Sequence, residues 1–224
     1  MKFWLPITIL FVAISVFVAV KSFKPVETKS DIACGTGNLS GLWTEPGLAY
    51  YNGIPVNETS YLTDSSITDS QTQVLGVAEP NDKWIEVDLS EQKIRAWDGS
   101  KLHLESLISS GLPGTPTPKG EFRIWAKLRY VKMEGGEGRY YYNLPNVPFT
   151  MFFESDSTPK YLGYGLHGTY WHNDFGKVHS HGCVNLPTSV AGQIYEWANP
   201  ILPQGKKSVF ASADNPGTKV VIHE

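Results

Sequence analysis

Residues 167–186, which read HGTYWHNDFGKVHSHGCVNL, hold four of the six histidines and one of the two cysteines of this chain. A cysteine is a nucleophile only as its thiolate, and an unperturbed thiol with a pKa of about 8.5 is mostly protonated at neutral pH. A neighbouring histidine can accept that proton and later return it to a leaving amine. The stretch therefore predicts a nucleophile, Cys183, with a histidine as its base.

The residues around Cys183 argue against a purely structural cysteine. Gly182 allows the backbone to turn tightly, and the N–H groups of such a turn can face a tetrahedral oxyanion. A core cysteine is more typical of an apolar strand than of a turn rich in glycine and histidine. The sequence places no geometric constraint on a Cys34–Cys183 disulfide. Because Cys34 lies in or beside a polar spacer, however, we expect Cys183 to be a thiol.

A zinc site is the sharpest alternative. His179, His181 and Cys183 alternate, so they could share one face of a strand with His167 as a fourth ligand. Structural zinc sites usually carry several cysteines at short spacing, however, and catalytic sites favour ligand pairs on a helix. The residue pattern therefore favours a thiol enzyme over a zinc site.

The order of base and nucleophile separates the families of thiol enzymes. His167 precedes Cys183, whereas papain-like and NlpC/P60-like hydrolases place the cysteine first. Sortases also place histidine before cysteine, but they use an arginine after the cysteine, and no arginine follows Cys183. These three families are therefore disfavoured.

Composition excludes several other classes. The chain has 224 residues with 19 Lys+Arg and 22 Asp+Glu, a formal charge of −3, which is unlike the basic surface of a general nucleic-acid binder. Apolar residues make up 41% and charged residues 18%, so the chain is not disordered. Its 21 glycines and 15 prolines indicate many turns and short strands.

The N-terminus predicts a membrane segment. Residues 3–20 carry no charge and are flanked by lysines. At about 1.5 Å per residue, this length just crosses a bilayer core of roughly 30 Å. We expect residues 1–24 to be an uncleaved anchor; the alternative is a signal peptide, although no clean A-x-A cleavage site is present.

Residues 25–80 are expected to be a polar linker. No Lys or Arg occurs between Ser30 and Asp82, and eight of the seventeen residues in 57–73 are Ser or Thr. Such a composition buries little apolar surface. The aromatic residues Trp43, Tyr50 and Tyr51 allow the alternative that a small part of the linker, before the Ser/Thr-rich stretch, is ordered.

Residues 81–224 predict one mostly β domain with one or two helices. Residues 188–198 have the pattern of a helix, with Thr188 as its cap and Pro200 beyond its end. Alternating apolar residues and turn signals, such as Asp98-Gly99, mark the strands. The expected strands are residues 85–89, 93–97, 101–108, 122–130, 149–153 and 219–223.

These motifs resemble the L,D-transpeptidase (YkuD-type) catalytic domain of bacterial cell-wall enzymes. The family signature is His-Gly-Thr, a gap of about a dozen residues, then Ser-His-Gly-Cys-x-Asn; it appears here at residues 167–169 and 180–185. Residues 84–89, 117–122 and 144–149 also match the family. Asn185 stands where other members carry an arginine thought to face the substrate, so that role does not transfer to this chain.

The resemblance implies a β-sandwich over residues 81–224 with the active site at its rim. The implied substrate is the stem peptide of peptidoglycan, and the resemblance implies no metal and no organic cofactor. Cys183 would attack the carbonyl of the third residue and expel the terminal D-Ala, and the side-chain amine of a second stem would resolve the thioester. Such an enzyme lies outside the cytoplasm, in the bacterial cell envelope, anchored here through residues 3–20.

The resemblance also implies the roles of individual residues. His167 would be the general base and acid, and the Gly168 carbonyl would orient its imidazole. The N–H groups of Gly182 and Cys183, helped by His181, would form the oxyanion hole. Two alternatives stay open: an L,D-carboxypeptidase that uses water as acceptor, and a catalytically silent module that binds the cell wall.

Overall fold

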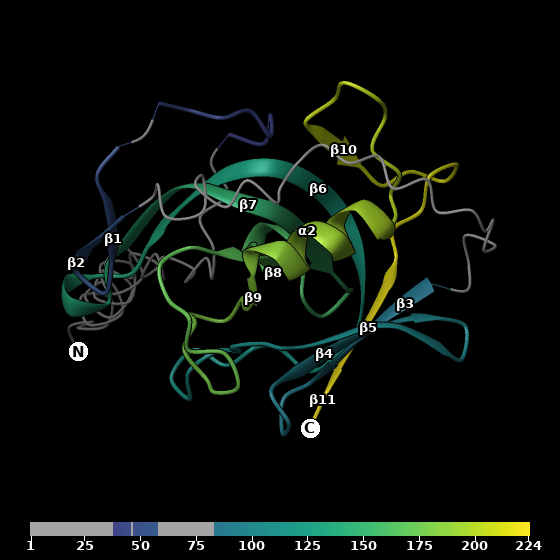
Figure 1. The fold of residues 1–224 in the computed structure, drawn as a ribbon, viewed down its shortest axis with the longest axis horizontal. Helices are drawn as coiled ribbons and strands as arrows, with labels where there is room; N and C mark the ends of the chain where they lie inside the picture. The colour runs from purple at the N-terminus through teal and green to yellow at the C-terminus, as the bar shows by residue number, and fades with distance from the viewer. Residues whose placement is uncertain (1–37, 46, 58–82) are drawn as a thin grey trace, which may run out of the picture. The chain divides into compact units, whose positions relative to one another are not determined.

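A computed structural model describes residues 38–45, 47–57 and 83–224 of the chain (Figure 1). The predicted anchor and residues 25–37, 46 and 58–80 of the predicted linker lie outside the described residues. None of the helices within the described residues has the length and apolar character needed to cross a membrane.

The described residues form eleven strands, one α-helix and two short 3-10 helices. The single α-helix matches the prediction of a mostly β domain with one or two helices. The elements are β1 (Ala49–Tyr51), β2 (Ile54–Val56), β3 (Lys83–Asp88), β4 (Lys93–Asp98), β5 (Lys101–Leu107), β6 (Gly120–Gly135), η2 (Gly138–Tyr140), β7 (Tyr142–Glu154), η3 (Lys160–Leu162), β8 (Gly165–Thr169), β9 (Val184–Pro187), α2 (Thr188–Trp197), β10 (Ser208–Phe210) and β11 (Lys219–His223).

The strands hydrogen-bond into one connected sheet in the order β2-β1-β7-β6-β11-β3-β4-β5. Off this path, β10 pairs with β6, and β8 pairs with both β7 and β9. Every pair is antiparallel except β11 with β3 and β8 with β9. In Figure 1 the long strands β6 and β7 arch above α2, and β3, β4, β5 and β11 lie below it.

Two apolar clusters fill the domain. The larger one joins β3, β4, β6, β7, β11 and α2, and its members include Ile85, Phe153 and Ile194, all at most 1% exposed. The second lies along β6 and β7 and includes Tyr51 and Cys183. Each large apolar side chain that is fully buried contributes roughly 1.5–3 kcal/mol, so the larger cluster dominates the stability of the fold.

All six predicted strands are present, and β6 and β7 are longer than expected. The unpredicted strands β1, β2, β8, β9 and β10 have at most five residues each. They lack room for a visible period-2 pattern, and β8 and β9 are buried on both faces. The expected cap of α2 is also different: Thr188 is the first helical residue, and its hydroxyl donates to the Thr169 carbonyl at 3.3 Å.

Strands β1 and β2 lie inside the range predicted as a linker, at the position of the ordered patch that its aromatic residues left open. Ala49 and Tyr51 alternate on one face of β1 and are buried, whereas Ile54 on β2 is exposed. Strand β1 pairs with β7 at Tyr50 and Asn143. Burial against β7 therefore orders part of the range that was predicted as a polar linker.

Candidate active site

The turn before β9 is held by side-chain hydrogen bonds. The Gly182 N–H donates to Ser180 Oγ at 3.0 Å, and the Ser180 hydroxyl donates to the Cys183 carbonyl. Thr117 Oγ1 donates to the Gly182 carbonyl at 2.9 Å. Gly182 has a φ of 120°, which a side chain would strain. The glycine and the two hydroxyls together fix the position of Cys183.

The parallel pairing of β8 with β9 brings the histidine close to the turn that carries the cysteine. His167 stands opposite Asn185 in the register, and Cys183 lies in the bend directly before β9. His167, Cys183 and Asn185 all line one pocket. The pocket is lined by Tyr51, Met133, Tyr142, Leu144, His167, Trp171, Ser180, His181, Cys183 and Asn185.

His167 is held as a neutral imidazole. Its side chain is 2% exposed, and Nδ1 lies 3.0 Å from the Gly168 carbonyl oxygen. A carbonyl oxygen only accepts, so Nδ1 carries the hydrogen and Nε2 keeps its lone pair. Burial lowers the pKa of His167 to about 4, although the Gly168 carbonyl opposes this effect. At neutral pH, Nε2 can therefore accept a proton.

The prediction that Cys183 is a free thiol is wrong for this structure, in which Cys183 is disulfide-bonded. The chain contains one other cysteine, Cys34, outside the described residues. Leu39, five residues after Cys34, packs against the same apolar cluster as Cys183. This tertiary contact brings part of the predicted linker close to the site, which sequence composition did not reveal.

His181 lies in the pocket with a buried Nε2 that has no hydrogen-bond partner among the described residues. Its ring centroid is 4.9 Å from that of Tyr142 and 5.8 Å from that of Tyr51. Burial, and then the neighbouring His179, lower its pKa, so His181 is neutral at pH 7. The predicted site residue therefore presents an imidazole nitrogen inside the pocket.

Several pocket residues were not predicted from the sequence. The Asn185 side-chain amide lies 2.8 Å from His172 Nε2, and burial, with His179 as the next cause, lowers the pKa of His172 to about 3. Tyr51, Trp171 and the β7 residues of the pocket were also missed as site residues. The aromatic content around residues 50 and 171 was the only local signal for them.

A second hollow of about 490 Å³ lies beside η3. Its walls include Trp125, Tyr161 and Phe210, with Glu154 and Lys160 as the charged groups. The residue after η3, Gly163, places its carbonyl oxygen 3.7 Å from Cys183 Sγ. One 3-10 helix therefore borders the hollow and leads directly to the cysteine.

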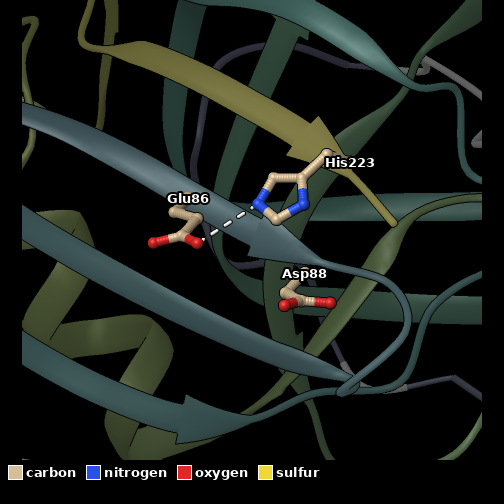
Figure 2. A group of neighbouring side chains, drawn as sticks. All are labelled: Glu86, Asp88 and His223. Carbon is tan, nitrogen blue, oxygen red and sulfur yellow. Dashed lines mark hydrogen bonds and ion pairs between the residues drawn. The ribbon is translucent and has the colours of Figure 1, made fainter.

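One group within the described residues brings three potential metal ligands within 4.8 Å of one another: Glu86, Asp88 and His223. Figure 2 shows His223 Nε2 bonded to Glu86, at 3.1 Å. Arg95 Nη1 lies 3.3 Å from Glu86 and 3.8 Å from Asp88, so a guanidinium already balances the carboxylates. The histidine and cysteine set considered for zinc does not form such a group.

Comparison with known proteins identifies the family. The family model described as the L,D-transpeptidase catalytic domain, YkuD, matches residues 82–222. The chain belongs to the YkuD family. The match includes every predicted catalytic residue and leaves β1 and β2 outside it. No curated protein sequence matches this YkuD chain.

Solved structures of L,D-transpeptidases are similar to this YkuD chain. An Enterococcus faecium L,D-transpeptidase is 29% identical, covering 63% of this chain and 50% of its own, with a TM-score of 0.48. An L,D-transpeptidase from Mycobacterium smegmatis is 20% identical over 64% of this chain and 59% of its own, with a TM-score of 0.50, which supports the fold. The chain thus spans about half the length of the first of these relatives.

Proposed function

We propose that this protein is a cysteine-dependent L,D-transpeptidase that cross-links peptidoglycan stem peptides and releases the terminal D-Ala. The observation that carries the proposal is that His167, from β8, and Cys183, from the bend before β9, line a common pocket. The family match over residues 82–222 supports the reaction class.

The first half of the reaction begins with reduced Cys183. His167 Nε2 accepts the thiol proton while Sγ attacks the carbonyl carbon of the third stem residue. The tetrahedral intermediate then collapses, the bond to D-Ala breaks, and protonated His167 gives its proton to the leaving amine. The product is a thioester on Cys183 and free D-Ala. The Gly168 carbonyl keeps the proton-accepting nitrogen directed into the pocket.

The second half transfers the acyl group to another stem. Its side-chain amine attacks the thioester carbon and gives a proton to His167, and the carbon–sulfur bond breaks. His167 then returns that proton to the departing Cys183 sulfur, so the enzyme is restored. If water replaces the amine, the same steps make an L,D-carboxypeptidase. The choice of acceptor decides between the two activities.

The oxyanion that forms in both halves needs hydrogen-bond donors. The candidates are the N–H groups of Cys183 and Gly182, with His181 beside them. In the structure the Gly182 N–H donates to Ser180 Oγ at 3.0 Å, so its contribution requires exchange of that partner for the substrate oxygen. His181 has a buried Nε2 with no partner among the described residues, which suits a role in shaping this part of the site.

The location of the reaction follows from its substrate. Peptidoglycan lies outside the cytoplasmic membrane, so the catalytic domain, residues 81–224, belongs in the cell envelope. Residues 3–20 would anchor the protein to the membrane. The remaining part of residues 25–80 would give the domain reach toward the wall.

The direct test is mass spectrometry of the reduced, purified protein with a disaccharide-tetrapeptide. We expect release of D-Ala, an acyl adduct on Cys183 and a dimer joined through third residues. Cys183→Ala should lose all three products, and Cys34→Ala, which also removes a thiol, should retain them. Tripeptide without dimer would indicate a carboxypeptidase. Full turnover by Cys183→Ala would refute the assignment of the nucleophile.

A further inference from the structure

Tyr51, from outside the region that matches the family, lines the pocket of the candidate active site. Its side chain comes from β1 and is 8% exposed. The ring stacks on that of His179, with centroids 5.4 Å apart and an interplanar angle of 12°, and meets the edge of His181 at 5.8 Å. The hydroxyl donates to the His179 carbonyl at 2.5 Å. Tyr51 is thus fixed by both its ring and its hydroxyl.

With Tyr51 in place, the pocket is too small for a substrate. The cavity beside the tyrosine, which His167 and Cys183 help to line, has a volume of about 20 Å³. This volume holds about one water molecule. Sites that accept drug-sized molecules have volumes of roughly 300–1,000 Å³, so part of this lining must move before a stem peptide can enter. Tyr51 is the lining residue that lies outside the family match.

The segment that carries Tyr51 is held by isolated hydrogen bonds and side-chain packing, not by a long β-ladder. We call residues 38–57, as far as the structure describes them, the strap. Its hydrogen bonds to the domain include three of 2.9–3.1 Å between Thr44 and Asn146 and one from the Gly53 N–H to the Tyr141 carbonyl at 2.9 Å. The Gly41 carbonyl also accepts from the Tyr130 N–H, and the Leu48 carbonyl accepts from the Asn143 side-chain amide, each at 3.2 Å. Trp43 packs edge-on against Tyr130, with centroids 5.0 Å apart.

The β-pairing of the strap to the domain is also short. The register of β1 with β7 contains one residue pair, Tyr50 with Asn143, whereas β6 and β7 pair over most of their length. Elements with few ladder bonds open locally at a lower free energy than the core of a sheet. The strap can therefore leave while the larger apolar cluster stays intact.

We propose that the strap is an autoinhibitory element, with Tyr51 as the group that closes the pocket over Cys183. The enzyme is inactive while Tyr51 lies in the pocket, and Cys183 becomes accessible when the strap separates from β7. This inference rests on the proposed function for the role of Cys183. Its physical content is the accessibility of one sulfur atom, which is measured without any turnover.

The experiment compares alkylation rates of Cys183 in the full chain after reduction and removal of the reductant. Iodoacetamide is the probe, and the modified peptide is quantified by mass spectrometry. Tyr51→Ala opens the pocket directly. Trp43→Ala loosens the strap at a residue that does not line the pocket. Tyr50→Ala is the matched control, because it removes a neighbouring aromatic ring from β1 and leaves the pocket untouched.

We expect Tyr51→Ala and Trp43→Ala to be alkylated roughly tenfold faster than the parent protein, since each loses the burial of a large aromatic ring. Tyr50→Ala should stay within about twofold. Circular dichroism melting confirms that each variant is folded. A variant that unfolds is replaced by Tyr51→Phe, which loses only the hydroxyl bond to His179 and should still be alkylated faster than the parent.

Two outcomes would refute the proposal that the strap is autoinhibitory. The first is an equal alkylation rate of Cys183 in all folded variants. The second is loss of turnover by Tyr51→Ala with an unchanged alkylation rate, which would make Tyr51 a substrate-binding residue. Faster alkylation in Tyr51→Ala and Trp43→Ala supports the strap whatever the turnover. Faster alkylation with no D-Ala release by any protein would support the strap and refute the proposed transpeptidase. The two proposals therefore fail separately.

Discussion

Acidification should destabilise this protein through His167, because its buried imidazole is neutral. Burial lowers the pKa of this group from 6.5 to about 4 in the folded chain. As the pH falls below 6.5, His167 therefore binds a proton in the unfolded chain but stays neutral in the folded chain. The contribution of neutral His167 to the free energy of unfolding is fully present above pH 6.5 and is lost as the pH falls toward 4. At 1.36 kcal/mol for each pH unit, the loss due to His167 is about 3 kcal/mol by pH 4.

The assay is urea unfolding at pH 7 and pH 4, followed by tryptophan fluorescence, with the disulfide state of Cys183 kept the same. Carboxylates and the other histidines also titrate over this range, so the informative quantity is the difference between the parent protein and His167→Gln. Between pH 7 and pH 4, we expect the free energy of unfolding of His167→Gln to fall by about 3 kcal/mol less than that of the parent protein. His103→Gln, at an exposed position, is the control and should follow the parent.

If His167→Gln and the parent lose the same free energy, the imidazole is not neutral in the folded protein. The reasoning about Nε2 as the proton acceptor would then fail as well. Identical m-values in the two proteins are required for this comparison, because a changed slope would indicate a change in the denatured state.

Three further predictions test other parts of the structure. Gly168→Ala places its Cβ 2.9 Å from a proline ring atom of β7, so it should lower stability by about 1–3 kcal/mol in thermal melting, whereas Gly114→Ala, with no atom within 4 Å, should not. Because Cys183 is disulfide-bonded in the structure, iodoacetamide should label it only after reduction. In the Cys34→Ser variant, Cys183 should be labelled without reductant. If labelling of Cys183 in this variant still needs reductant, Cys34 is excluded as its disulfide partner. Burial lowers the pKa of Lys127 to about 7, below its usual 10.5, so stability should rise between pH 7 and 10.5, and an equal rise in Lys127→Met would contradict this.

The sequence by itself predicted the family and most of the framework. The six strands with regular alternation and the helix at 188–198 were visible because local periodicity reflects one buried face. The residues at 167–169 and 180–185 were visible because nucleophile, base and glycine recur at a recognisable spacing. The close approach of the Gly168 carbonyl to His167 Nδ1, at 3.0 Å, agrees with the orientation expected from the resemblance.

Tertiary structure alone decided which residues close the site. Strands β8 and β9 are too short to show a period, yet their parallel pairing brings His167 close to the bend that carries Cys183. The strap could not be found from local sequence patterns, because Tyr51 is ordered by His179, which is 128 residues away in the chain. The same holds for the disulfide state of Cys183. Local patterns report the conformation that a segment prefers, but the closing of a pocket depends on contacts between segments that are distant in sequence.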